Sequence, residues 1–201
     1  MDHYQPTKGS LIQNNIYRTK LDGLFYLEHT QYSDERGFFA ELALIPDLNE
    51  ITDINFSIAQ INQAHSTTNV IRGFHAEDWN KLVYIVQGIA FCALADTRPD
   101  SNTFGQVETF MFGNHPEKTL NGALFVSSGI ANSICVTKGP VDYLYFVDQL
   151  YRDRAKDDDV AISLFDQDLA VYWPIAKESM IFSDRDNQSI TLRQKFPDKF
   201  K

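Results

Sequence analysis

The chain has 201 residues, of which 43% are hydrophobic and 22% are charged, a composition typical of a globular protein with one core. Its net charge of −9 argues against nucleic acid as a partner, because contact with phosphates needs a basic surface. No apolar run reaches the roughly eighteen residues of a membrane span, so no membrane partner is expected. Two cysteines without paired spacing favour a reducing, cytoplasmic location.

The predicted elements are mostly short strands. Residues 1–20 are polar and without periodicity, which predicts an N-terminal arm, and residues 21–201 are expected to form a single domain. Runs of β-branched and aromatic residues, bounded by turn residues, predict strands at 24–27, 55–61, 81–86, 89–95, 105–112, 122–126, 133–137 and 143–147. The pair Gln87-Gly88 predicts a tight hairpin turn.

Helical signals are weak and confined to residues 46–50 and to a charged surface segment at 148–159. Many short strands at regular spacing indicate an all-β fold, either an antiparallel sandwich or a jelly-roll barrel with few short helices.

His75 differs from the other four histidines because it ends the run Ile71-Arg72-Gly73-Phe74-His75 and is followed closely by Lys81. The twofold period of a strand would put Arg72 and Phe74 on one face, and Gly73 and His75 on the other. The residues alone leave two interpretations open, a structural histidine or a catalytic base.

Other kinds of site lack their sequence patterns. A metal site is not expected, because no second histidine stands at strand spacing from His75. The chain also has no Gly-x-Ser-x-Gly elbow, no glycine-rich phosphate loop and no cysteine with a histidine nearby in the sequence.

Taken in order, segments along nearly the whole chain beyond residue 20 resemble the dTDP-4-dehydrorhamnose 3,5-epimerase family. The matching segments are residues 34–41, 60–62, 71–75, 81–83 with Gly88, 96–98, 101–105, 129–132, 144–145, Tyr151, 166–174 and 182–186. The resemblance implies a cupin-type jelly-roll homodimer that works without metal or organic cofactor. Its expected substrate is a nucleotide-diphospho 4-keto-6-deoxy sugar, in deoxysugar biosynthesis.

The same resemblance implies roles for individual residues. His75 matches the base, Asp186 the aspartate that orients it, with Asp166 as the second choice, and Tyr145 the acid. Lys81 matches a lysine near the sugar. The residues expected to bind the substrate are Arg36, Glu41, Gln60, Asn62, Arg72, Asn132 and Tyr151. Tyr143 shares a strand face with Tyr145, so the choice between the two tyrosines rests on the resemblance.

These residue types suit the chemistry. Removing a proton beside a ketone leaves an enolate, and a neutral imidazole can accept that proton near neutral pH. A cation such as Lys81 can stabilise the oxygen where negative charge develops. Inversion needs a proton delivered from the opposite face, which a phenol that is protonated at neutral pH can supply.

Two departures from the family pattern bear on specificity. Asn132 stands where the family has a histidine, and an amide cannot act as a base, although it can donate a hydrogen bond. This change predicts epimerisation at C3 or C5 alone, or action on another sugar. The loop from Ala76 to Asn80 is shorter than usual and carries the carboxylates Glu77 and Asp78, which would disfavour a pyrophosphate unless they point away.

Two other functions remain open from the sequence. A ketoisomerase that moves the carbonyl between C3 and C4 uses similar enolate chemistry. A non-catalytic sugar-nucleotide-binding protein would account for the missing histidine, but it would not need His75, Lys81 and Tyr145 together.

Overall fold

A computed structural model describes residues 2–113, 119–153 and 161–200. The strands are β1 (Leu11–Gln13), β2 (Ile16–Arg18), β3 (Leu24–Glu28), β4 (Thr30–Asp34), β5 (Gly37–Glu41), β6 (Gln60–Ser66), β7 (Ile71–His75), β8 (Lys81–Asp96), β9 (Val107–Gly113), β10 (Gly122–Val126) and β11 (Ile130–Val147). The helices are α1 (Ile45–Thr52), α2 (Asp184–Asn187) and α3 (Leu192–Lys195), with 3-10 turns η1 (Tyr151–Asp153), η2 (Lys177–Ser179) and η3 (Pro197–Phe200).

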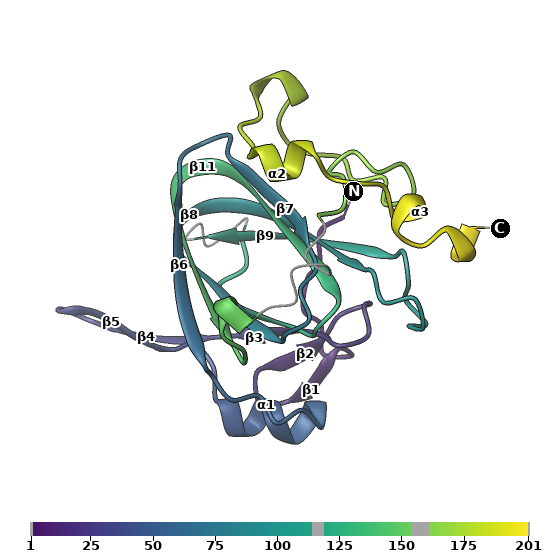
Figure 1. Ribbon diagram of the computed structural model, residues 1–201. Helices are drawn as coiled ribbons and strands as arrows, with labels where there is room; N and C mark the ends of the chain where they lie inside the picture. The colour runs from purple at the N-terminus through teal and green to yellow at the C-terminus, as the bar shows by residue number, and fades with distance from the viewer. Residues whose placement is uncertain (1, 114–118, 154–160, 201) are drawn as a thin grey trace.

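The two long strands β8 and β11 pair along their whole length and pass through both halves of a barrel (Figure 1). In one half they continue the sheet β1-β2-β3-β10-β8-β11-β6, and in the other half β9 pairs with β8 and β7 pairs with β11. All of these pairings are antiparallel. The expected all-β barrel with few short helices is confirmed.

The predicted hairpin at Gln87-Gly88 is wrong. Residues 81–86 and 89–95 belong to the single strand β8, just as 133–137 and 143–147 belong to β11. The register shifts where Lys138 pairs with Ile89 and Asp142 with Gln87, so β11 holds extra residues opposite Gly88 and both strands bend there. Gly88 has a φ of +85°, and a Cβ at this position would lie 2.4 Å from the Pro140 carbonyl oxygen. A glycine in this conformation signals a bulge as well as a hairpin.

The N-terminal segment also differs from the expectation of an arm. Strands β1 and β2 extend the sheet through β3, and the Tyr4 ring packs against those of Tyr26 and Phe110. The strand expected at 55–61 begins only at Gln60, whereas the weak helical signal at 46–50 corresponds to α1. Part of the charged segment 148–159 lies outside the described residues.

Three apolar clusters hold the layers together. One fills the barrel between its two halves, where Val83 and Ile85 meet Cys92 and Leu94. A second cluster lies under α1, which buries Leu48. This helix has a proline in its first turn, where the backbone N–H has no partner within the helix and its absence is tolerated.

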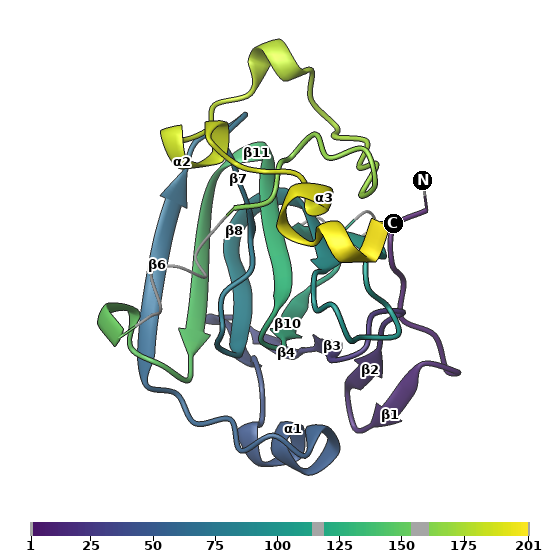
Figure 2. The same ribbon diagram turned by 45° about the vertical axis from the view of Figure 1, so that its right-hand side comes forward.

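The third cluster attaches the C-terminal segment to the outside of the β7 and β9 half, with Phe74 and Phe91 against Trp173 (Figure 2). This packing brings α2 beside β7, at the rim of the barrel. No helix among the described residues has the length and apolar character needed to cross a membrane.

Candidate active site

A cavity of about 270 Å³ lies at the end of the barrel where β7 meets α2. Its walls come from both halves of the barrel, with His75 on β7 and Tyr145 on the far end of β11. The lining residues are Ala64, Arg72, His75, Glu77, Lys81, Asn132, Ile134, Tyr143, Tyr145, Tyr151 and Arg185. The cavity therefore gathers most of the charged and aromatic residues singled out in the sequence.

The alternation expected for β7 is wrong, because Arg72 and His75 both line the cavity. Opposite β7, Asn132 pairs with His75 and Ile134 with Arg72, so two residues of β7 face one residue of β11. The extra residue is a bulge that reverses the side-chain alternation. Phe74 consequently points outward into the third cluster, and His75 turns into the cavity.

Asp186 contacts the His75 imidazole at its Nε2 atom. The distance from His75 Nε2 to Asp186 Oδ1 is 2.7 Å, and the Ser183 hydroxyl donates to Asp186 Oδ2 at 2.9 Å. Ser183 caps α2 by accepting from the Asp186 N–H, which fixes the carboxylate at the start of the helix. An imidazole that donates its Nε2 proton to Asp186 carries its lone pair on Nδ1.

Burial alone would raise the pKa of Asp186, whose side chain is only 2% exposed. The hydrogen bond and the charge of His75, with the bonds from Ser183, outweigh that effect and hold the pKa below its ordinary value. The carboxylate is therefore negative at neutral pH.

The second-choice aspartate has a structural position. Asp166 Oδ1 accepts the backbone N–H groups of Asp168 and Leu169, and its Oδ2 accepts that of Leu192. These bonds join the loop after residue 161 to α3. Asp186, and not Asp166, contacts His75.

Two tyrosines face the same cavity, and their ring centroids are 5.7 Å apart. Burial raises the pKa of Tyr145, the negative charge of Glu77 raises it further, and Arg72 acts in the opposite direction. Burial also raises the pKa of Tyr143, well above its usual range. Both phenols thus keep their protons at neutral pH, and the choice between them remains one of position.

Lys81 is the centre of a polar cluster on the cavity wall. Its ammonium donates to Glu77 Oε2 and, at 2.6 Å, to Asn132 Oδ1. The Asn132 amide in turn donates to the Tyr143 hydroxyl at 3.3 Å. The directions of the Glu77 and Asp78 side chains are open from the sequence. In the structure Glu77 lines the cavity, whereas Asp78 is exposed.

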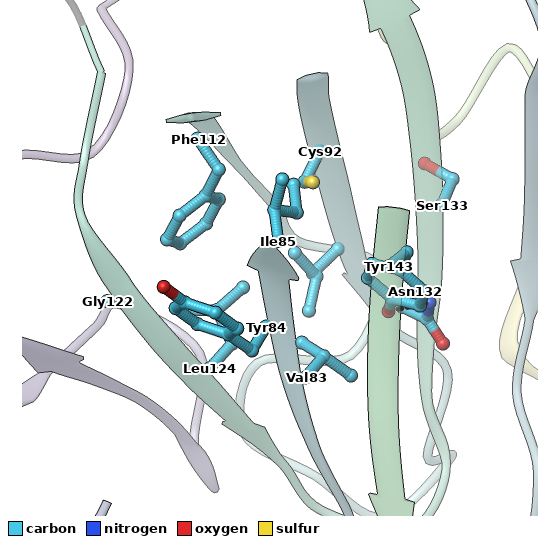
Figure 3. A pocket seen from close by; sticks show the side chains of 11 residues that line it. Val83, Tyr84, Ile85, Cys92, Phe112, Gly122, Leu124, Asn132, Ser133 and Tyr143 are labelled. Atoms are coloured by element: carbon cyan, nitrogen blue, oxygen red, sulfur yellow. Dashed lines mark hydrogen bonds between the residues drawn. The ribbon is translucent and has the colours of Figure 1, made fainter. Parts of the chain in front are cut away.

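Asn132 and Tyr143 also form the boundary between this cavity and the apolar interior of the barrel. Figure 3 shows their side chains close together on β11, beside Val83 and Ile85, with Cys92 and Phe112 further inside. A polar substrate that enters the cavity therefore meets a floor of one amide and one phenol.

Three of the expected binding residues lie at the rim. Tyr151 lines the cavity next to Trp79, and its backbone N–H donates to Gln60 Oε1 at 2.9 Å. The Gln60 amide donates to Asn62 Oδ1, and Asn62 pairs with Tyr145 across β6 and β11. Gln60 and Asn62 thus connect the rim to the strand that carries Tyr145.

Arg36 and Glu41 do not line the cavity. They belong to the hairpin of β4 and β5, a separate two-stranded sheet that extends away from the barrel (Figure 1). Arg36 forms an exposed ion pair with Asp34 on the same hairpin. Within one chain these two residues are separate from His75.

Sequence reasoning assigned no role to Arg185, which also lines the cavity. It lies beside Asp186 on α2, so the segment that supplies the histidine's partner brings a cation as well. Among the described residues, no three histidine, cysteine, aspartate or glutamate side chains are grouped as metal ligands.

Comparison with known proteins identifies the family. Residues 18–194 match the sequence model of the family described as dTDP-4-dehydrorhamnose 3,5-epimerase. The chain belongs to this family. It is an enzyme of the sugar-nucleotide epimerase type, and the jelly-roll fold of the cupin type expected from the resemblance is confirmed.

The chain is similar to relatives along most of its length. It is 28% identical to the dTDP-4-dehydrorhamnose 3,5-epimerase of Escherichia coli strain K12, over 89% of this chain and 94% of that protein. It is 25% identical to a dTDP-4-dehydro-6-deoxyglucose 3-epimerase of a Streptomyces species, over 88% of each chain. A Legionella pneumophila 3,5-epimerase crystallised with dTDP-4-keto-L-rhamnose superposes with a TM-score of 0.80 at 27% identity, covering 92% of this chain and 96% of that one.

Proposed function

We propose that this protein is a cofactor-independent epimerase of a nucleotide-diphospho 4-keto-6-deoxy sugar, acting at C3, C5 or both. The observation that carries the proposal is that His75, paired with Asp186, and Tyr145 line one cavity, in a chain of this family. A dTDP-linked sugar is the substrate we favour, since the relatives named above act on such sugars.

In the proposed reaction, His75 removes the proton from the carbon beside the ketone. Asp186 stabilises the imidazolium that forms, because its carboxylate stays negative next to it. The resulting enolate places charge on the ketone oxygen, where the Lys81 ammonium can donate a hydrogen bond. Tyr145 then protonates the carbon from the other side, and both residues recover their original state by exchange with solvent.

The amide at position 132 favours inversion at a single carbon. Asn132 accepts from Lys81 and donates to Tyr143, so its polar atoms support the floor of the cavity and no proton can be stored there. We expect C3 to be inverted, as in the Streptomyces 3-epimerase named above, and C5 to be inverted more slowly or not at all.

We further propose a homodimer in which the β4–β5 hairpin of one copy reaches the cavity of the other. Arg36 and Glu41, expected to bind substrate, lie on this hairpin, and Tyr32, Phe38 and Phe39 expose more than half of their surface there. Apolar side chains of this size, exposed together, mark a protein interface. Light scattering at several concentrations tests the dimer, and a monomer with full activity would contradict it.

The direct test of function is proton exchange. Several nucleotide-linked 4-keto-6-deoxy sugars are incubated with the protein in heavy water, and deuterium at C3 and C5 is followed by NMR. Entry at C3 or C5 supports the proposal, and entry at C3 without C5 supports the role given to Asn132. The absence of exchange with every sugar would contradict the proposal, and migration of the carbonyl would indicate a ketoisomerase. The cytoplasmic location stays a prediction.

A further inference from the structure

We propose that Glu77 is a positioning residue of this cavity, whose carboxylate holds the Lys81 ammonium against the Asn132 amide so that one N–H is directed at the substrate. The inference rests on the proposed function and adds to it a residue that the resemblance did not assign. Its basis is the contact of Glu77 Oε2 with Lys81 Nζ and the 2.6 Å distance from Nζ to Asn132 Oδ1.

The number of hydrogen bonds limits the orientation of Lys81. An ammonium has three N–H donors, and two of them are directed at Glu77 and Asn132. The third is left for a ligand, and its direction is set by the other two. A lysine side chain with several rotatable bonds would otherwise sample many positions, and a poorly aligned donor contributes little to stabilising an enolate oxygen.

Burial gives this contact its importance. The Lys81 side chain is 5% exposed and that of Glu77 is 16% exposed, so the ammonium has little contact with water. A buried charge that loses its partner is costly. Glu77 thus allows the chain to keep a lysine in the cavity although an amide replaces the family histidine at position 132.

The adjacent carboxylate provides a matched control. Asp78 is exposed and does not line the cavity, so Asp78→Asn removes the same charge one residue away. Glu77→Gln keeps an oxygen that can accept from Lys81, whereas Glu77→Ala removes the contact entirely. Comparing the three variants separates the hydrogen bond from the charge and from general effects of the loop.

The first measurement needs no substrate. In protein labelled with ¹⁵N, a buried ammonium held by two acceptors exchanges its protons slowly enough to give an NMR signal. A signal that is absent from the spectrum of Lys81→Met is assigned to Lys81. We expect the signal in the wild type, in Asp78→Asn and, weakened, in Glu77→Gln. It should be lost in Glu77→Ala. Retention of the signal in Glu77→Ala would overturn the inference.

The second measurement is steady-state kinetics with the sugar that exchanges deuterium. Glu77→Ala should lower kcat about tenfold with little change in KM, because a misplaced group affects the reaction more than binding. Glu77→Gln should recover most of the loss, and Asp78→Asn should match the wild type. A glutamine variant no better than alanine, or an alanine variant equal to Asp78→Asn, would overturn the positioning role.

The two failures remain distinguishable. A wild type that exchanges no sugar contradicts the proposed function, and the ammonium signal still decides whether Glu77 holds Lys81. An active wild type with an unchanged Glu77→Ala variant contradicts only the inference about Glu77.

Discussion

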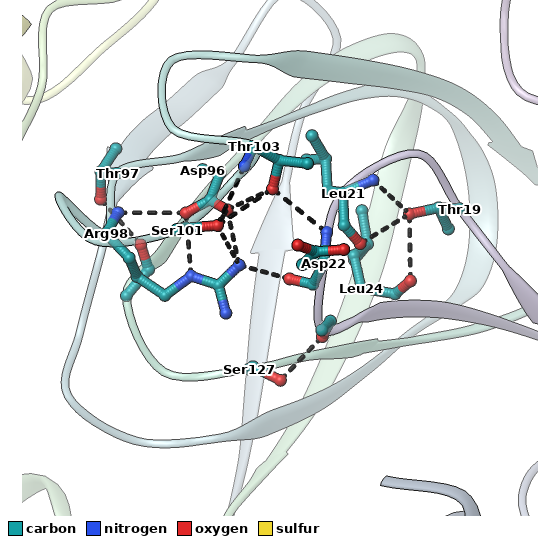
Figure 4. Close-up of polar contacts among 12 residues, drawn as sticks. Thr19, Leu21, Asp22, Leu24, Asp96, Thr97, Arg98, Ser101, Thr103 and Ser127 are labelled. Carbon is teal, nitrogen blue, oxygen red and sulfur yellow. Dashed lines mark hydrogen bonds and ion pairs between the residues drawn. The ribbon is translucent and has the colours of Figure 1, made fainter.

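Among the residues that the structure describes, two buried aspartates contact a basic side chain, and they serve different purposes. Asp96, at the end of β8, accepts from the Arg98 guanidinium and from the hydroxyls of Ser101 and Thr103 (Figure 4). Arg98 also donates to the Asp22 carbonyl, so this network joins the N-terminal segment to the loop after β8. Asp186 contacts a histidine that lines the cavity.

The comparison shows which features separate a structural carboxylate from one suited to catalysis. Hydrogen bonds from neighbouring groups hold the pKa of both aspartates below the ordinary value, against the opposing effect of burial. The difference lies in the partner. A guanidinium is a fixed charge, whereas an imidazole can gain and lose a proton, and that of His75 lines a cavity. A lowered carboxylate pKa alone therefore does not identify an active site.

The largest effect is expected for His75→Asn. Asparagine fills the same place but cannot accept a proton, so deuterium entry into the sugar should slow by about 10³-fold, as expected for loss of a general base. The free energy of unfolding should change little. NMR of the sugar in heavy water measures the rate, and thermal unfolding is the control. Exchange at the wild-type rate would remove His75 from the mechanism.

Asp96→Asn should affect stability and leave catalysis intact. The substitution removes the charge of a fully buried carboxylate and leaves the partly exposed Arg98 guanidinium without its charged partner. This should lower the free energy of unfolding by about 3 kcal/mol. The rate of deuterium entry per folded molecule should equal that of the wild type. Urea unfolding and the exchange assay test both statements. A loss of rate without a loss of stability would reverse the assignment of the two aspartates.

The sequence predicted the strands and the cavity residues better than the long-range geometry. His75, Lys81, Asn132 and Tyr145 lie together as the family resemblance implied. The prediction failed for β7 and for Gln87-Gly88, where bulges change the register. A bulge depends on how many residues the partner strand offers, and a single segment does not contain that information.

Glu77 illustrates a second limit. Its sequence position, in a loop four residues before Lys81, allowed it to face the cavity or the solvent. The outcome depends on Lys81, the first residue of β8, being buried. It also depends on the contact between the Lys81 ammonium and Asn132 on β11. Only the folded arrangement of three segments decides which of two adjacent carboxylates, Glu77 or Asp78, becomes part of the site.

Asp186→Asn should lower the rate of deuterium entry by about 10²-fold, less than the loss of His75. The amide keeps a hydrogen-bond acceptor for Nε2 but lacks the charge that stabilises the imidazolium formed during proton removal. NMR of the sugar in heavy water measures the rate. A variant rate equal to that of the wild type would contradict this electrostatic role.

The smallest effect concerns acid stability. Both aspartates have a folded-state pKa below the unfolded value of about 4, so each stabilises the fold above that value and loses its contribution as the pH falls through the folded pKa. Urea unfolding from pH 7 to pH 3 should show a constant difference between the wild type and Asp96→Asn near neutrality, closing in acid. The difference for Asp186→Asn should close in the same direction, because the pKa of Asp186 is also lowered in the fold. A difference in the free energy of unfolding that widened in acid would mean that the carboxylates are protonated in the fold. The comparison between an aspartate paired with arginine and one paired with histidine would then lose its electrostatic basis.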